Sequence, residues 1–225
     1  MNDKILDILE FNRITDQLKD LAITEPAREK AETLRPSSDA DKVKAQLDQT
    51  YTLTNILRIK GNLPLTNFKD VRPSTKRLRI KANLSSKEFG NILLILTLAN
   101  DITGFMDQID EISLDSISNI LARLEIPQDL FNRLKKSVDY DGEVLDSASP
   151  ALARIRHDIR SNEEEIKSKM DAYTKGNQSK YLSEAIVTIR DDRYVIPVRQ
   201  EYRAKFGGVV HDQSASGQTL FIEPE

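Results

Sequence analysis

The 225-residue sequence contains no cysteine and no tryptophan, and it has only two histidines. Without cysteine there can be no disulfide, thiolate metal site or cysteine nucleophile. The two histidines, His157 and His211, are too few for a histidine-based metal centre, which leaves only a carboxylate site open. Glycine and proline are also sparse, with eight of each, and 6% of the residues are aromatic. This composition favours long helices over a sheet-rich sandwich.

Long hydrophobic runs and a strong net charge are missing as well. The longest apolar run, FGNILLILTLAND at 89–101, is shorter than the roughly 18–20 residues of a membrane span. The N-terminus lacks the continuous apolar region of a signal peptide. We therefore expect a cytoplasmic protein without membrane contact. A net charge of −3 indicates that any nucleic-acid binding depends on a local basic patch.

Helical periodicity and cap residues predict a helical block that ends near residue 137. We interpret the apolar run at 89–101 as a central core helix rather than an exposed partner face. The helix starts are predicted from Thr24 with Pro26, from Ser38 with Asp41, from Asp70 with Pro73 and from the capping box SSKE at 85–88. The remaining helices are predicted over 3–21, with a bend, and over 114–124 and 128–136.

The character of the sequence changes after residue 137. Four acids, Asp139, Asp141, Glu143 and Asp146, cluster there, but Gly142 comes too early for an EF-hand loop, so a solvated turn is favoured over a metal site. Ser149 and Pro150 then open a helix. That helix has an apolar seam of Leu152, Ile155, Ile159, Ile166 and Tyr173, which predicts one arm of a short antiparallel coiled coil. No partner arm is evident, and we therefore expect the chain to be a fragment.

From residue 184 the apolar pattern alternates with a period of two, which predicts strands. EAIVTIR and RYVIPVR form a hairpin that turns at Asp191 and Asp192, and GGVVHD and GQTLFIE follow as two further strands. Pro197 lacks an N–H, so we expect it on an edge strand or at a bulge. The predicted fold class is mainly α, with a helical bundle (1–137), a connector and coiled-coil arm (138–183) and a small antiparallel sheet (184–225).

The stretch HDQSASG at 211–217 raises the question of a hydrolase. It is not the G-x-S-x-G elbow, and small polar residues that end in Gly217 between two apolar runs are typical of a hairpin loop. The sequence also contains no G-x-x-x-x-G-K-[ST], G-x-G-x-x-G or H-E-x-x-H motif. We therefore assign no catalytic, cofactor-binding or metal-binding residue within the chain.

Basic residues gather in the C-terminal part. Residues 174–210 hold seven basic and four acidic residues, a net charge of +3 inside an acidic chain, which makes this segment the candidate nucleic-acid surface. Tyr181, Tyr194 and Tyr202 lie among these charges, where they can stack on sugars or bases, although tyrosines in strands more often pack. The candidate binding residues are Lys175, Lys180, Arg190, Arg193, Arg199, Arg203 and Lys205.

Four blocks of the sequence resemble the amino-terminal part of the second bacterial MutS paralogue, the branch of the MutS mismatch-repair family that carries an Smr nuclease domain. They are KILDILEFNRI, LRPSSDADKVKAQLDQT, DYDGEVLDSASPALARIRHDIR and EAIVTIRDDRYVIPVRQEYRAKFGGVVHDQSASGQTLFIEP. The similarity runs over essentially the whole chain. It departs from the family at Pro26-Ala27, where a Leu-Gly pair is expected, and this difference affects only a helix start.

The resemblance implies a domain order for the full-length protein. The chain begins with the lever helices, continues into the clamp, returns through the lever, and then reaches an ABC-type ATPase and an Smr endonuclease domain. Residues 1–137 would be lever, the arm from about 150 would lead to the clamp, and the sheet from about 184 would be part of the clamp. ATP and Mg²⁺ are implied for the full-length protein and no cofactor for this chain. Proteins of this kind form homodimers, bind branched DNA, suppress homologous recombination and are implicated in acting on collided ribosomes.

Two hypotheses from different classes follow. In the leading one, the chain is the lever and clamp portion of a MutS-type ATPase and endonuclease that binds branched or duplex DNA or ribosomal RNA. It predicts salt-sensitive binding that falls when Arg193, Arg199 and Arg203 are replaced. The alternative is a helical coiled-coil adaptor that docks a protein partner and is insensitive to those arginines. An enzyme complete within these residues is disfavoured, and a loss of activity on mutating Asp141 or His211 would be needed to support it.

Overall fold

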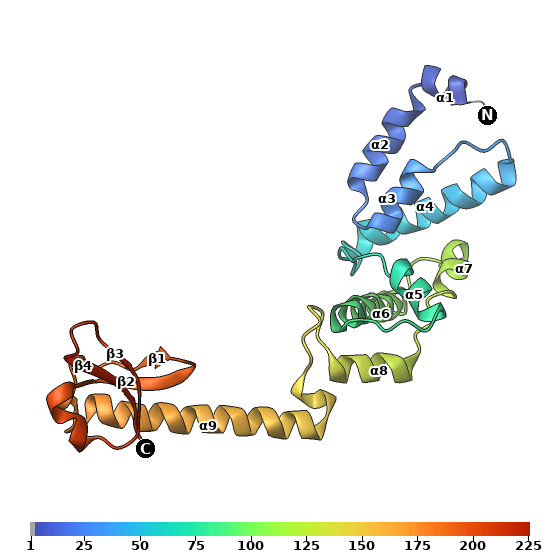
Figure 1. Ribbon diagram of the computed structural model, residues 1–225. Coiled ribbons are helices and arrows are strands. Elements are labelled where there is room, and N and C mark those ends of the chain that lie inside the picture. The colour runs from blue at the N-terminus through green and yellow to red at the C-terminus, as the bar shows by residue number, and fades with distance from the viewer. Residues whose placement is uncertain (1–2) are drawn as a thin grey trace. The chain divides into compact units, whose positions relative to one another are not determined.

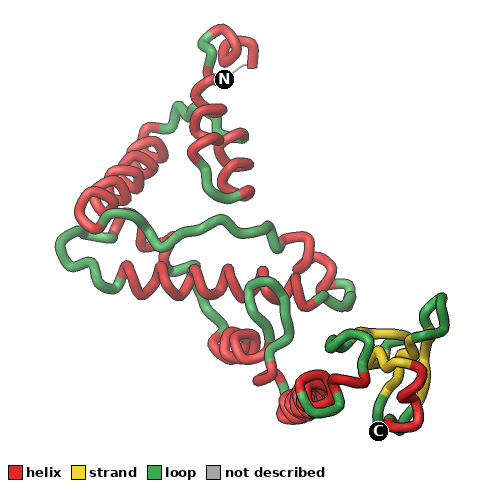
Figure 2. The backbone as a smooth tube through the Cα atoms, turned by 90° about the vertical axis from the view of Figure 1, so that its left-hand side faces the viewer, coloured by secondary structure: helices red, strands yellow, loops and turns green. Residues whose placement is uncertain are grey.

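The computed structural model of the chain describes residues 3–225. It consists of two compact units, Met1–Ser149 and Pro150–Glu225 (Figure 1). The first unit is helical, and the second joins a long helix to a small antiparallel sheet (Figure 2). The predicted fold class, mainly α with a small antiparallel sheet, is confirmed. The three predicted segments, 1–137, 138–183 and 184–225, stay a prediction.

The bend predicted within residues 3–21 is confirmed. Glu10 has a left-handed backbone, with φ 52°, and it separates the first two helices although the apolar periodicity is continuous. In chain order the helices of the first unit are α1 (Asp3–Ile8), α2 (Phe11–Leu21), α3 (Glu25–Glu32), α4 (Ala40–Lys60), α5 (Arg72–Arg79), α6 (Ser86–Met106), η1 (Asp115–Ile117), α7 (Ser118–Leu121), α8 (Gln128–Ser137) and η2 (Asp146–Ala148).

Two of the four predicted cap residues, Thr24 and Ser85, cap their helices. Asp70 lies one residue before Val71, the N-cap of α5, although its carboxylate accepts a hydrogen bond of 2.9 Å from the backbone N–H of Arg72. The Thr24 hydroxyl accepts a hydrogen bond from the backbone N–H of Ala27 at the start of α3. The capping box of α6 is complete, because Ser85 and Glu88 each accept a hydrogen bond from the other's backbone N–H. The predicted start of α4 at Ser38 is wrong, because the carboxylate of Asp39 caps this helix by accepting from two N–H groups of its first turn, each at 3.1 Å. A carboxylate is the stronger acceptor there, and it also suits the positive end of the helix dipole.

Helix α6 supplies residues to two hydrophobic clusters of the first unit. Leu93 packs with Phe131 of α8, and Met106 packs with Ile56 of α4 and Ile117 of η1. The interpretation of this segment as a core helix is thereby confirmed. By length and composition alone, α6 is also the one helix among residues 3–225 that could cross a membrane, but core helices pass the same test.

The turn predicted after α8 is confirmed, but it packs against α6 on one side rather than being fully solvated. The Asp139 carboxylate accepts hydrogen bonds from the backbone N–H groups of Asp141 at 3.0 Å and Glu143 at 2.8 Å. Gly142 has φ 87° and lies directly against the backbone at Lys87, in the first turn of α6. The turn is therefore packed onto the start of the core helix, and a side chain on Gly142 would prevent this approach.

The second unit contains the four predicted strands. They form an antiparallel sheet in the order β1-β2-β4-β3. The predicted hairpin turn is confirmed, since Asp191 and Asp192 both have left-handed backbones, as a two-residue hairpin loop requires. The elements are α9 (Pro150–Lys175), η3 (Ser179–Tyr181), β1 (Thr188–Arg190), β2 (Arg193–Arg199), η4 (Gln200–Lys205), β3 (Val209–Gln213) and β4 (Thr219–Glu223).

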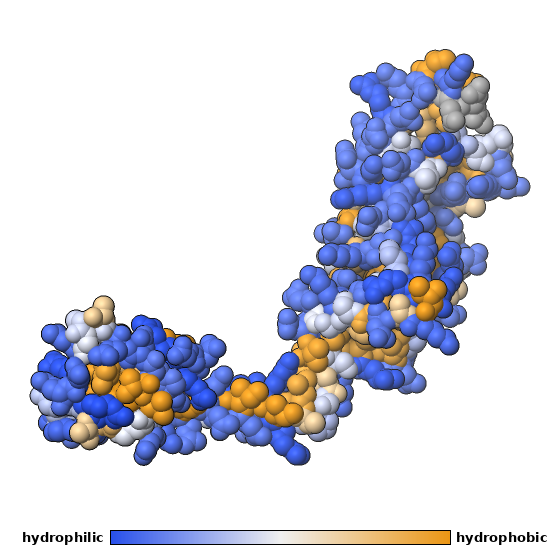
Figure 3. All heavy atoms as spheres, in the orientation of Figure 1, coloured by the Kyte–Doolittle hydropathy of each residue, from blue (hydrophilic) through white to orange (hydrophobic). Residues whose placement is uncertain are grey.

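Only the C-terminal part of α9 belongs to the core of the second unit. Met170 is buried there with Ile196 of β2 and Ile222 of β4. Further toward the start of α9, Ile155 is 57% exposed and Ile159 is 51% exposed. Figure 3 shows hydrophobic surface along this part of the helix. A partner arm for this stripe is not identified, so the coiled-coil arm stays a prediction.

Pro197 was expected on an edge or at a bulge. The edge expectation is wrong for β2 as a whole, because this strand pairs with β1 on one side and with β4 on the other. Pairing with β1 ends at Val195, however, so Pro197 faces no β1 residue. Its carbonyl accepts a hydrogen bond from the N–H of Ser183 at 2.8 Å, and its missing N–H lies on the same side. The irregularity of the sheet is instead in β3, between Val210 and Asp212.

Candidate nucleic-acid interface

One face of the sheet packs on α9, and the opposite face carries three of the seven candidate basic residues. Ile196 and Val198 of β2 are buried on the α9 side. Because side chains alternate along a strand, Arg193 and Arg199 point to the other side. Arg190 of β1 is paired with Arg193 and shares that side. We refer to this side of the sheet as the outer face.

Two arginines of the outer face are already paired. The Arg190 guanidinium lies 3.2 Å from the carboxylate of Asp212 and 4.6 Å from the ring centroid of Phe221. Arg193 lies 3.5 Å from the carboxylate of Glu223. Both acids fall outside the segment 174–210 whose charge was counted from the sequence, so sequence reasoning missed these counter-ions. They reduce the positive potential of the outer face.

Arg199 differs from its two neighbours. It is exposed, and its guanidinium forms no ion pair with any described residue. It lines an open hollow of about 420 Å³ together with Glu201 and four neutral polar residues, Ser183, Gln200, Gln218 and Thr219. Because one carboxylate shares this hollow, Arg199 alone does not give it a clear preference for anions.

Two other candidates have structural partners. Arg203 donates hydrogen bonds to the backbone carbonyls of Phe206, at 2.6 Å, and Gly208, at 3.1 Å, and it thereby holds the chain between η4 and β3. Lys175, in the last turn of α9, lies 2.8 Å from the carboxylate of Asp171. Arg203 is therefore a poor candidate for direct nucleic-acid contact.

The last two candidates, Lys180 and Lys205, meet at one tyrosine. The Lys205 ammonium donates a hydrogen bond of 3.1 Å to the hydroxyl of Tyr181 and lies 4.3 Å from the ring centroid. The Lys180 ammonium lies 5.1 Å from the same centroid. The hydrogen bond from Lys205, together with the positive charges of both lysines, lowers the pKa of the Tyr181 hydroxyl.

The candidate tyrosines mainly pack. The rings of Tyr181 and Tyr202 are 4.8 Å apart between centroids, and Tyr181 also meets the edge of Phe206. Phe206 belongs to the hydrophobic cluster on the α9 side of the sheet, and Tyr181 and Tyr202 pack against this cluster. Tyr194 is 43% exposed and lies on the α9 side of the sheet. Sequence reasoning had no signal for the meeting of Lys180 and Lys205, because it depends on how η3 and η4 pack.

The stretch at 211–217 covers the end of β3 and most of the hairpin loop before β4, so the predicted loop is confirmed for its serines and Gly217. The Ser214 hydroxyl accepts a hydrogen bond from the N–H of Thr219 at 3.1 Å, and Gly217 has φ 72°. His211 stands at the irregularity of β3, and its Nε2 lies 2.7 Å from the carboxylate of Glu223. The histidine is thus held by a carboxylate of the neighbouring strand, and the serines serve the turn.

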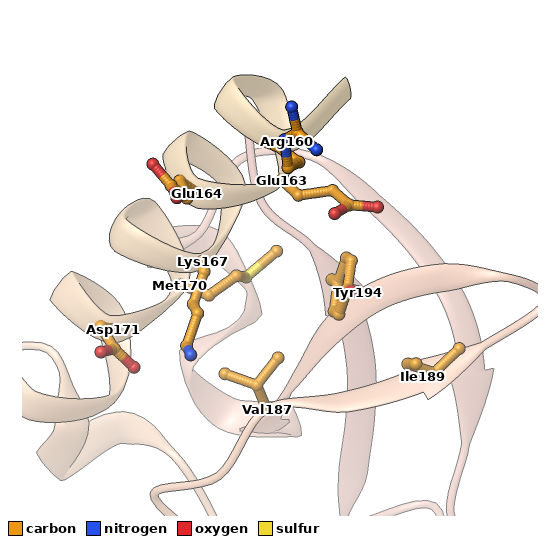
Figure 4. A pocket seen from close by; sticks show the side chains of 9 residues that line it. All are labelled: Arg160, Glu163, Glu164, Lys167, Met170, Asp171, Val187, Ile189 and Tyr194. Carbon is orange, nitrogen blue, oxygen red and sulfur yellow. The ribbon is translucent and has the colours of Figure 1, made fainter. Parts of the chain in front are cut away.

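A pocket of about 550 Å³ lies between α9 and the β1–β2 hairpin (Figure 4). Met170, Val187, Ile189 and Tyr194 form its apolar lining. Charged side chains of α9 complete it, and Figure 4 shows them along the helix opposite the β1–β2 hairpin. In the sequence, the apolar residues Val187 and Ile189 alternate with the polar residues Thr188 and Arg190, and this pattern indicated that one side of the β1 segment is apolar. Mixed charges around an apolar floor favour a partner with both apolar and polar groups over a bare phosphate.

The structure thus defines a helical protein whose small sheet unit carries the candidate basic residues. No family model matches the chain. The whole chain is 69% identical to the endonuclease MutS2 of Lactobacillus acidophilus, 67% to that of Lactobacillus helveticus and 58% to that of Lactobacillus johnsonii. It spans 29% of the length of each of these relatives. The chain belongs to the MutS family, in the branch of the second bacterial paralogue.

Proposed function

We propose that the chain is the lever and clamp portion of a MutS-type protein and that it binds nucleic acid through its second unit. The observation that carries this proposal is the identity of 69% over the whole chain to a relative named as an endonuclease, which is an enzyme of nucleic acids. The basic residues of the sheet unit support it, because phosphate attraction provides most of the affinity of non-specific binding. The helical first unit is proposed to be the lever.

The finer parts of the proposal come from the family resemblance. The full-length protein would be a homodimer that binds branched DNA, suppresses homologous recombination and acts on collided ribosomes. ATP with Mg²⁺ and the nuclease residues would belong to other parts of that protein. The residues of this chain do not fit ATP or Mg²⁺. The sequence has no Walker motif that could bind ATP, and no group of three potential metal ligands occurs among residues 3–225.

Fluorescence anisotropy tests the proposal. The 225-residue chain is titrated into labelled duplex, four-way-junction DNA and structured RNA at several salt concentrations. We expect saturable binding that weakens with salt, and the preferred ligand names the target class. Absence of binding even at low salt would contradict nucleic-acid recognition by this part of the protein.

The exposed isoleucines of α9 favour a second candidate, a coiled-coil adaptor. Ile155 and Ile159 are both more than half exposed on a helix of 26 residues. An apolar stripe of this kind is typical of a helix that packs on another helix. Self-association or partner binding that survives replacement of Arg193 and Arg199, in a chain that does not bind nucleic acid, would favour this candidate.

A further inference from the structure

Two lysines from separate segments of the second unit converge on Tyr181. Lys180 is its neighbour in η3, and Lys205 ends η4. The segments are held together by aromatic packing, since Tyr181 contacts Tyr202 at 4.8 Å and Phe206 at 6.3 Å between ring centroids, and Phe206 is only 3% exposed. The ring of Tyr181 is thereby fixed, while both ammonium groups remain on exposed residues.

Neither lysine is neutralised by a carboxylate among residues 3–225. In this they differ from Lys175, Arg190 and Arg193, each of which has an acidic partner. Two ammonium groups beside one neutral hydroxyl repel each other, and an anion placed between them would relieve that repulsion. Each ammonium has three donors, and Lys205 spends only one of them on Tyr181.

We propose that Lys180, Lys205 and the hydroxyl of Tyr181 form a phosphate-binding site that takes one phosphodiester of a nucleic-acid backbone. The two ammonium groups supply charge to the non-bridging oxygens, and the hydroxyl donates a hydrogen bond to one of them. The ring of Tyr181 orients the lysines and does not stack on a base, because it is packed against Tyr202 and Phe206. The site rests on the proposed function, which it deepens by naming the contact.

The exposed position of the site favours a polymer over a free phosphate. Lys180 and Lys205 stand on the surface, and neither belongs to the described pockets. An open site of two lysines holds a single free phosphate weakly in water, because the charges are screened. A backbone that delivers successive phosphates gains from each such contact.

The test measures nucleic-acid affinity of the full chain and of Lys180→Gln, Lys205→Gln and Tyr181→Phe at two salt concentrations. Lys169→Gln is the matched control, because Lys169 is exposed, is paired with Glu165 and is not one of the candidate binding residues. Affinity for a duplex falls as salt is raised from about 50 to 200 mM, and each phosphate contact contributes a factor of about 3.5 to that fall. A variant that lacks one phosphate contact should therefore lose about 3.5-fold less affinity over this range than the unmodified chain does. We expect a reduction of up to this size for each lysine variant, because the other lysine still faces the phosphodiester, and no change for the control. Tyr181→Phe should weaken binding without changing the salt dependence, since its hydroxyl is uncharged.

A second readout uses inorganic phosphate as the probe. The ionisation of Tyr181 is followed by tyrosinate absorbance, as the difference between the chain and Tyr181→Phe. Bound phosphate should raise the pKa of Tyr181, because it brings negative charge to the two lysines. The effect should disappear in Lys180→Gln and Lys205→Gln.

The outcomes separate this site from the proposed function. If the chain binds nucleic acid but both lysine variants keep the original salt dependence, the site is wrong and the proposed function stands. A second outcome is that the chain binds no nucleic acid, while inorganic phosphate raises the pKa of Tyr181 only when both lysines are present. The proposed function and the phosphodiester ligand would then be overturned, and a site for free phosphate would remain. If neither effect is seen, both proposals fail.

Discussion

Arg203 binds two backbone carbonyls at the junction of η4 and β3, whereas Arg199 binds no described partner. Replacing Arg203 by alanine leaves the carbonyls of Phe206 and Gly208 without their donor. We expect Arg203→Ala to lower the free energy of unfolding by roughly 1–3 kcal/mol. The exposed Arg199→Ala should change it by less than about 0.5 kcal/mol. Urea denaturation followed by circular dichroism measures both.

A lysine at position 203 provides a stricter comparison. Lysine keeps the charge but lacks the planar fork that reaches two carbonyls, so Arg203→Lys should recover little of the lost stability. If Arg203→Ala were as stable as the unmodified chain but bound nucleic acid less tightly, Arg203 would be a contact residue and its structural role would be wrong.

The seven candidate residues show how far charge can be interpreted from a sequence. The excess of basic residues in 174–210 is a property of the sequence and needed no structure. Which of them are neutralised was not predictable, because Asp212 and Glu223 come from strands whose register fixes the pairs with Arg190 and Arg193. Local sequence does not specify that register.

The start of α6 is a complete capping box that also binds α5. The Ser85 hydroxyl accepts from the N–H of Glu88, and the Glu88 carboxylate accepts from the N–H of Ser85 at 2.9 Å. The same carboxylate accepts from the hydroxyl of Ser74 and pairs with Arg77, both at 2.8 Å. We expect Ser85→Ala to destabilise the chain by about 1 kcal/mol in thermal or urea unfolding. An unchanged stability would mean that this cap is replaced by water.

The pH dependence of the same helix start follows from Glu88. The hydrogen bond from the Ser85 N–H, followed by that from the Ser74 hydroxyl, lowers the pKa of Glu88 below its ordinary value of 4.5. A lowered folded-state pKa stabilises the fold fully above about pH 4.5, and this stability is lost as the pH falls through the folded pKa. Glu88→Gln should therefore destabilise the chain at pH 7, with a smaller difference below pH 4.5, as measured by urea unfolding at each pH.

Two glycines of α6 offer a matched pair of substitutions. A Cβ on Gly90 would lie 2.7 Å from the carbonyl oxygen of Asp139, whereas a Cβ on Gly104 has no atom within 4 Å. Gly104→Ala should stabilise the chain by about 0.5–1 kcal/mol through helix propensity. Gly90→Ala should destabilise it by about 1–3 kcal/mol, because backbone has to move. Thermal unfolding distinguishes the two signs, and stabilisation by both would contradict the close packing of the acidic turn.

Apart from the cap placed at Ser38 instead of Asp39, element prediction succeeded where short-range chemistry decides, and it failed where a partner decides. The caps at Thr24 and Ser85 and the turn at Asp191 are local, and they were predicted correctly. The edge position of Pro197 was wrong for β2, because β1 and β4 flank this strand while β1 stops short of Pro197. The contact of Gly90 with the turn at 139–142 likewise joins segments about fifty residues apart, which periodicity does not address.

At the scale of the whole chain, each unit has a hydrophobic core of its own. The first unit builds its clusters around α6, and the second builds one from α9, η3, η4 and the sheet. Helical periodicity was enough to predict the helices, and the later switch to a period of two was enough to predict the sheet of the second unit. The start of the long helix at Pro150 was predicted from Ser149 and Pro150. That the connector at 138–149 packs with the first unit depends on contacts with α6, for which the sequence had no signal.

The independent core of the second unit leads to a test on residues 150–225 alone. Its buried cluster, which includes Met170, Val198 and Phe206, lies entirely within this segment. We therefore expect the isolated segment to fold cooperatively in thermal circular dichroism, although a core of this size gives a small margin of stability. Because all candidate basic residues lie in it, it should keep the nucleic-acid affinity and salt dependence of the full chain, whereas residues 1–149 should not bind. A folded segment that fails to bind, beside a full chain that binds, would move the interface to the helical unit and contradict both proposals for the sheet.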